Sequence, residues 1–231
     1  MIINSFLEYL TLERNYSKHT VIAYRKDLNS FYEFCIDEFD LTSLTQVNYG
    51  QIRSWIVQLV DDGVSNNSIN RKISSLKSFY KFLQKTQQVA KSPLAKHKAL
   101  KVAKKVQIPF TINEINKVIE GLGIEENFLS LRNRLIVELF YSTGMRRAEL
   151  IGLKVGSVHV KAQTLKVLGK RNKERLLPLI PSVVDTIRKY MIERERLKIK
   201  TDYLLVTEKG NKIYETLVYR VINSYFSKVS T

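Results

Sequence analysis

The sequence contains a single cysteine, Cys35, and this scarcity excludes an internal disulfide framework. No apolar run approaches the roughly 20 residues that a membrane-spanning helix requires. The N-terminal stretch MIINSFLEYL lacks the basic start and the cleavage site of a signal peptide. We therefore expect a cytoplasmic protein with no membrane partner. Cys35 should be a small core residue, because it shares a helical face with Tyr24, Leu28 and Phe31.

Acidic residues are also scarce, since 22 Asp and Glu stand against 38 Lys and Arg and leave a formal charge of +16. The usual partner of such an excess is a polyanion, and nucleic acid is the first candidate. Hydrophobic residues make up 44% of the 231 positions, which excludes a disordered chain and suits one or two domains with real cores.

The N-terminal part reads as helical and shows no strand signal. Ser17 is the expected N-cap of the second helix, and Gly63 the expected residue that ends the third. The pattern predicts four helices, at 2–14, 18–38, 46–61 and 67–85.

A lysine-rich segment without acidic residues, QQVAKSPLAKHKALKVAKK, follows the fourth helix. Its self-repulsion and sparse apolar content favour a linker. We therefore predict a helical domain at 1–86, a basic linker at 87–107 and a second domain at 108–231.

The second domain begins with a predicted capping box, Thr111 with Glu114. After two further helical stretches, SVHVKAQTLKVLGKRNKERLLPLI alternates apolar and polar residues and predicts a small antiparallel sheet. The expected fold is therefore mainly α with a small sheet. The remaining expected elements are helices at 131–142 and 182–198, a short helix ending near 153, a short strand YLLVT and a last helix from about 215.

Two adjacent arginines, Arg146 and Arg147, stand in STGMRRAEL at the start of a predicted helix, where a cation opposes the helix dipole. A phosphate would offset this cost, because backbone N–H groups and a planar guanidinium can bind the same oxyanion. The alternative is structural: one arginine pairs with Glu149 or Glu138, and the other is solvated.

A second basic feature is Lys170, at the tip of a predicted hairpin among Arg171, Lys173 and Arg175. By itself such a turn is usually a solvated loop. Like charges nearby, however, lower the pKa of a lysine, which could then donate a proton to a leaving alkoxide.

Together, STGMRRAELIGL and the lysine of VLGKRNKERLLPL, 24 residues after Arg146, resemble the catalytic domain of tyrosine recombinases, specifically the Xer type. The stretches SKHTVIAYRKDLNSFYEF and SINRKISSLKSFYKFL resemble the helical core-binding, SAM-like domain of that family. The resemblance implies that Arg146 binds the scissile phosphate, that Glu149 holds Arg146 in place and that Lys170 protonates the leaving 5′ oxygen.

The family's second catalytic set is a His-x-x-Arg-His stretch, a later His or Trp and a tyrosine nucleophile. None of His19, His97 and His159 is followed three residues later by arginine, and we nominate none of the twelve tyrosines as the nucleophile. We therefore expect a recombinase cut short, with only the first part of an α+β catalytic domain, that binds DNA without cleaving it.

Residues opposite the apolar helix faces are candidates for DNA contact, although a charged outer face is also the default for any amphipathic helix. With the hairpin residues, the candidates are Lys18, His19, Thr20, Arg25, Lys26, Arg71, Ser75, Ser78, Lys81, Arg171 and Lys173.

The expected activity is site-specific strand exchange through a 3′-phosphotyrosine, without metal or nucleotide cofactor, in resolution of chromosome dimers. The resemblance implies double-stranded DNA as substrate, a tetramer of this chain or of two related recombinases, and a septal DNA translocase as a further partner. An integrase of a phage or conjugative element is one alternative. A non-catalytic DNA-binding protein naturally ending at Thr231 is another.

Overall fold

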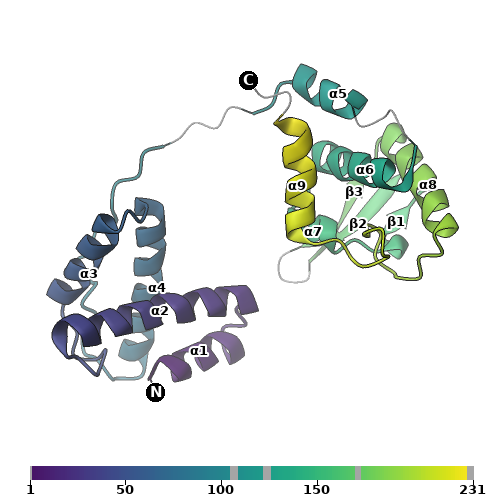
Figure 1. The fold of residues 1–231 in the computed structure, drawn as a ribbon. Coiled ribbons are helices and arrows are strands. Elements are labelled where there is room, and N and C mark those ends of the chain that lie inside the picture. The colour runs from purple at the N-terminus through teal and green to yellow at the C-terminus, as the bar shows by residue number, and fades with distance from the viewer. Residues whose placement is uncertain (1, 105–108, 122–125, 170–172, 228–231) are drawn as a thin grey trace. The chain divides into compact units, whose positions relative to one another are not determined.

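The computed structural model describes residues 2–104, 109–121, 126–169 and 173–227, and the chain divides into two compact units, Met1–Val106 and Gln107–Thr231 (Figure 1). Within the described ranges, no helix is both long and apolar enough to cross a membrane.

The first unit is helical, as the apolar periodicity predicts. Ser17 caps the second helix by accepting a hydrogen bond from the backbone N of Thr20 at 3.3 Å, and Gly63 has the left-handed φ of 75° that favours glycine. Both local predictions are confirmed. The four helices are α1 (Ile2–Leu12), α2 (Lys18–Phe39), α3 (Tyr49–Asp61) and α4 (Asn66–Lys85).

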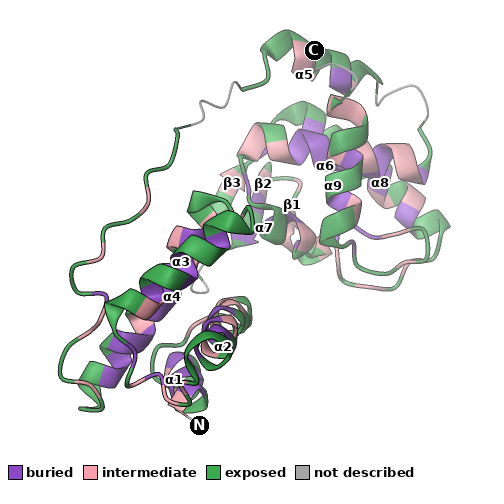
Figure 2. Ribbon diagram, turned by 60° about the vertical axis from the view of Figure 1, so that its left-hand side comes forward, coloured by how far each residue is buried: buried purple, intermediate pink, exposed green. Residues whose placement is uncertain are grey.

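Large aromatic side chains fill the core of this unit, and Figure 2 shows buried and exposed residues alternating along its helices. Phe31 of α2 packs against Trp55 of α3, with ring centroids 4.9 Å apart, and Phe6 of α1 meets Phe79 of α4 at 5.4 Å. The prediction for Cys35 is confirmed, since its side chain is fully buried in the same core.

The predicted basic linker is packed against this unit over much of its length. Leu94 is buried in the helical core, and the Asn70 side chain of α4 both donates to and accepts from the backbone of Leu100, each at 2.9 Å. One turn nearer the start of α4, the side chain of Asn66 donates to the carbonyl of Lys101 at 2.8 Å. Hydrogen bonds between two asparagine side chains of α4 and the backbone of this segment thus attach it to the helix, although its composition alone suggests a free chain.

Among the residues described, the second unit combines five α-helices and one 3-10 helix, η1, with a small antiparallel sheet in the order β1-β2-β3. Buried Leu165 and Val167 face the helices, and α6 packs against α8 on that side of the sheet (Figure 1). The capping box is confirmed, because Thr111 N donates to Glu114 and Glu114 N donates to the Thr111 hydroxyl. The elements are α5 (Ile112–Gly121), α6 (Phe128–Thr143), α7 (Arg147–Ile151), η1 (Val155–Ser157), β1 (Val158–His159), β2 (Thr164–Leu168), β3 (Glu174–Pro178), α8 (Pro181–Arg196) and α9 (Glu215–Phe226).

The predicted strand YLLVT is wrong. It forms only two isolated bridges, Lys154 with Tyr203 and Val206 with Lys212. The physical reason is a buried guanidinium: Arg194 donates to the carbonyls of Thr201, Tyr203 and Leu204 at 2.7 to 2.9 Å. These carbonyls are satisfied by a side chain instead of by a neighbouring strand.

Candidate active site and nucleic-acid interface

The turn between α6 and α7 places the first arginine. Gly144 ends α6 in the left-handed conformation, with φ of 59°, and its N–H donates to the carbonyl of Phe140 at 3.0 Å. Two residues later, Arg146 is the N-cap of α7. The sharp reversal therefore presents Arg146 at the start of a new helix, where backbone N–H groups lack helical partners.

Glu149 holds Arg146 at two points. The Arg146 backbone N donates to Glu149 Oε2 at 2.8 Å, and its Nη1 donates to Oε1 at 3.1 Å. The Arg146 side chain is 70% exposed, whereas that of Glu149 is 5% exposed. A buried carboxylate thus orients a guanidinium whose other N–H groups face solvent.

The second partner of this carboxylate, Arg175, was not predicted from the sequence. Arg175 of β3 donates to both Glu149 oxygens, Nη1 to Oε1 and Nη2 to Oε2, each at 2.9 Å. The strand pattern did indicate that Arg175 points inward. Arg175 pairs with buried Val167, and it lies two residues from Leu177, so both side chains are on the core side of the strand. A cation at such a position requires an anionic partner.

Gly169 permits this bridge beside the hairpin. A Cβ added there would stand 3.2 Å from Arg175 Nη1 and 3.5 Å from Glu149 Oε1. The Gly169 N–H also donates to the carbonyl of Lys173 at 2.8 Å, which closes the neck of the β2–β3 hairpin. The Glu149–Arg175 pair therefore fastens the base of the hairpin to α7.

Two sequence-predicted residues of the hairpin, Lys170 and Arg171, lie outside the described residues, so their roles stay predictions. Lys173 is described and exposed. Arg147 forms an exposed ion pair with Glu215 of α9 at 2.7 Å.

The hydrogen bonds from Arg175, reinforced by those from Arg146, lower the pKa of the Glu149 carboxyl to about 2. Because this value lies below the ordinary 4.5, the pairing stabilises the fold above pH 4.5, and this contribution is lost as the pH falls from 4.5 towards 2. Glu149→Gln removes that titration. We expect the free energy of unfolding of the variant to depend less on pH over this interval than that of the parent chain.

Urea unfolding between pH 2 and 7 measures this difference. Glu120→Gln, at an exposed glutamate of the same unit, is the control and should retain the parent's pH dependence. Parallel curves for the parent and Glu149→Gln would contradict the assignment of a depressed pKa to Glu149.

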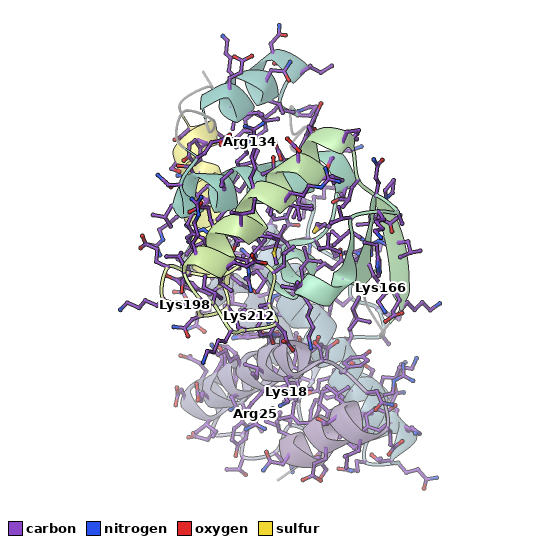
Figure 3. All side chains as sticks on the ribbon, turned by 90° about the vertical axis from the view of Figure 1, so that its right-hand side faces the viewer. Lys18, Arg25, Arg134, Lys166, Lys198 and Lys212 are labelled. Carbon is purple, nitrogen blue, oxygen red and sulfur yellow. The ribbon has the colours of Figure 1, made fainter. Side chains whose placement is uncertain are left out.

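Most predicted DNA contacts on α2 lie on the surface. Lys18, His19, Arg25 and Lys26 are exposed, and Figure 3 labels Lys18 and Arg25 on this helix. Thr20 is half-buried, and its hydroxyl lies 2.9 Å from that of Ser17 at the N-cap. Four of the five positions are thus open to a ligand.

On α4 one prediction needs correction. Ser75 was expected on the outer face, but it is 2% exposed, and its hydroxyl donates to buried Asp27 at 2.7 Å. It therefore cannot contact a DNA backbone directly. Arg71 and Lys81 are exposed, and Ser78 is half-buried.

No metal site is evident in the part of the chain that the structure describes, since no three His, Cys, Asp or Glu side chains gather there to hold an ion. The chemistry that the described site supports is the binding of an oxyanion by a fixed arginine.

Both units match known protein families. Residues 3–87 match the family model described as phage integrase, N-terminal SAM-like domain, and residues 105–230 match that of the phage integrase family. Tyrosine recombinase XerC of Chlorobaculum parvum is 32% identical over 99% of this chain and 76% of its own length. Tyrosine recombinase XerC of Pediococcus pentosaceus is 36% identical over 82% of this chain and 63% of its own length. The chain thus spans less than two thirds of the Pediococcus relative.

Solved structures share the fold. A XerH site-specific recombinase bound to a palindromic difH substrate has a TM-score of 0.74 and 21% identity, covering 94% of this chain and 64% of its own. The Tn1549 transposon integrase in complex with circular intermediate DNA has a TM-score of 0.76 and 14% identity, covering all of this chain and 80% of its own. Two family models that together span nearly every residue, with curated relatives above 30% identity, establish that the chain belongs to the phage integrase family, the tyrosine recombinases.

Proposed function

We propose that this chain is the DNA-binding and phosphate-binding part of a site-specific DNA recombinase that cleaves and rejoins strands through a 3′-phosphotyrosine. The observation that carries the proposal is the exposed Arg146 guanidinium held by buried Glu149, which is itself held by Arg175. A fixed planar donor at a helix start suits a phosphate whose charge grows in the transition state.

The proposed reaction proceeds by in-line displacement at phosphorus. A tyrosine hydroxyl gives its proton to solvent, its oxygen bonds to the scissile phosphorus, and the bond from phosphorus to the 5′ oxygen breaks. Arg146 stabilises the charge on the non-bridging oxygens, and Lys170 gives its proton to the departing oxygen. No histidine of this chain is followed three residues later by arginine, so the proposal assigns no residue here to the second catalytic set or to the nucleophile. The chain alone should bind DNA and leave it uncut.

Resolution of chromosome dimers by an Xer-type recombinase is the role we propose, supported by the names of the curated relatives. An integrase of a mobile element is the alternative, supported by the fold shared with the Tn1549 integrase. A non-catalytic DNA-binding protein is a third. Reading the gene beyond codon 231 discriminates the last of these, because a His-x-x-Arg-His box followed by a tyrosine would exclude it.

Double-stranded DNA is the proposed substrate, and a tetramer of this chain or of two related recombinases is the proposed assembly. Lambda integrase has been solved as a tetramer bound to a Holliday junction, and it shares this fold with a TM-score of 0.72. We also propose that a septal DNA translocase activates the recombinase and that the protein is cytoplasmic. Its DNA-binding and catalytic domains are proposed to be separate and to join near residue 107.

Binding of the chain to a mixed-sequence DNA duplex should depend strongly on salt, because the charge of +16 predicts release of many counterions. Each neutralised phosphate contributes about 0.9 to the slope of log affinity against log salt. Fluorescence anisotropy between about 50 and 200 mM salt measures the slope. A flat response would count against DNA as the substrate.

A further inference from the structure

A buried carboxylate in the first unit joins the two helices that carry the predicted DNA contacts. Asp27 of α2 is 1% exposed, and both of its oxygens accept hydrogen bonds from α4. Arg71 Nη1 donates to Oδ2 at 2.6 Å and its Nη2 to Oδ1 at 2.8 Å, while the Ser75 hydroxyl donates to Oδ2 at 2.7 Å. The carboxylate is thus satisfied entirely by side chains of the neighbouring helix.

Helix packing alone does not require this arrangement. Removing a carboxylate from water is costly, and apolar side chains of similar volume usually hold two helices together at least as well as a buried ion pair. What a carboxylate supplies and an apolar pair does not is a fixed orientation of the guanidinium, since the two parallel hydrogen bonds define its plane.

The two partners differ in exposure. The side chain of Asp27 is 2% exposed, whereas that of Arg71 is 54% exposed. A guanidinium has five N–H donors, and Asp27 accepts from two of its nitrogens, so further donors of Arg71 remain on the side toward solvent. Lys72, the other cation near Asp27, differs in placement: its Nζ lies 3.6 Å from Oδ1 and 5.8 Å from the centre of the Trp55 ring. Arg71 alone of these two presents its charge mainly outward.

Other polar residues of α2 and α4 are exposed or half-buried. Exposed Arg25 and Lys26 precede Asp27 on α2, and half-buried Ser78 and exposed Lys81 follow on α4. Lys81 comes ten residues after Arg71, which corresponds to about 15 Å along a helix. Both cations are exposed on α4 and are therefore available to phosphates.

We infer that Asp27 is a positioning residue for DNA binding, which acts by holding Arg71 in one orientation toward the duplex. The inference rests on the proposed function, because it assumes that this surface contacts DNA. Asp27, a buried acid on α2, thereby joins the residues that determine the affinity for DNA, through its contact with Arg71 on α4.

The direction in which Asp27→Asn changes the affinity for DNA distinguishes this role from bulk electrostatics. Asp27→Asn removes a negative charge from a DNA-binding protein, so bulk electrostatics predicts tighter binding. The positioning role predicts weaker binding, by about tenfold, because the charge-assisted contact made by Arg71 loses its fixed geometry.

The experiment uses the 231-residue chain and a mixed-sequence duplex, with anisotropy measured from low to moderate salt. Asp37→Asn is the matched control: it removes the same charge from an exposed position of α2 and should leave binding unchanged or slightly tighter. Arg71→Ala should weaken binding and reduce the salt slope by about 0.9. In the Arg71→Ala background, Asp27→Asn should have no further effect, because Asp27 acts through Arg71.

Arg71→Lys keeps the charge at a position that is 54% exposed, so it tests orientation even if Asp27→Asn fails to fold. We expect it to bind several-fold more weakly than the parent, because an ammonium cannot form the two-point pair. Parent-like binding by Arg71→Lys, or unchanged or tighter binding by folded Asp27→Asn, would overturn the positioning role. A parent chain that shows no salt-dependent binding would instead refute the proposed function itself.

Discussion

Replacing Arg146 by alanine in the complete recombinase that we propose should slow strand cleavage by on the order of a hundredfold or more, with a much smaller loss of DNA affinity. The guanidinium is held at the start of α7 by Glu149 and is 70% exposed, so it needs no rearrangement to meet a phosphate. Its contribution should grow as charge accumulates on the phosphate oxygens in the transition state. Ground-state binding is shared among many cations, and the loss of one of them is small by comparison.

Single-turnover cleavage of a duplex recombination site, at saturating protein, measures the chemical step, and anisotropy on the same duplex measures affinity. Arg147→Ala is the matched control, because Arg147 is adjacent, also exposed and paired with Glu215 at the surface. It should cleave at nearly the parent rate. Equal losses of rate for the two variants, or a loss of affinity as large as the loss of rate for Arg146→Ala, would contradict the assignment to Arg146.

Features set by neighbouring residues could be predicted from the sequence. The Ser17 cap, the left-handed Gly63 and the Thr111–Glu114 capping box each depend on side chains within a few positions of one another. The alternation through β2 and β3 likewise predicted the antiparallel pairing, which places Leu165 opposite Leu177.

Contacts between residues distant in the sequence were not predicted, whereas the local pair of Arg146 with Glu149 was. Glu149 and Arg175 are 26 positions apart, and Asp27 and Arg71 are 44 apart. Composition and periodicity assign a residue to a face of a helix or strand, but they do not specify which opposite charge faces it. The alternation around Arg175 indicated an inward-facing cation without identifying Glu149 as its partner.

Two features of the first unit differ from the predictions for the same physical reason. Ser75 was assigned to the outer face because its side chain is polar, yet the hydroxyl lies inside because buried Asp27 needs a donor there. The lysine-rich segment after α4 was assigned to a linker on its charge, yet Asn70 binds its backbone at Leu100. In both cases a hydrogen bond with a residue distant in the sequence outweighs the local pattern.

Lys170 is the general acid that we propose from the resemblance to tyrosine recombinases. Lys170→Ala in the complete recombinase should slow cleavage of an ordinary duplex by on the order of a hundredfold, because the departing 5′ oxygen then leaves without a proton. A substrate in which that oxygen is replaced by sulfur has a leaving group that needs no proton. It should therefore restore much of the rate lost in Lys170→Ala.

The same sulfur substrate should leave Arg146→Ala slow, because Arg146 acts on the non-bridging oxygens, which the replacement does not change. The measurement is the ratio of single-turnover rates on the sulfur and oxygen substrates for the parent, Lys170→Ala and Arg146→Ala. Lys173→Ala is the matched control, since Lys173 is an exposed lysine of the same hairpin, and its ratio should equal that of the parent. If Lys170→Ala and Arg146→Ala gave the same ratio, Lys170 would be a phosphate-binding cation and the proton would have to come from another group.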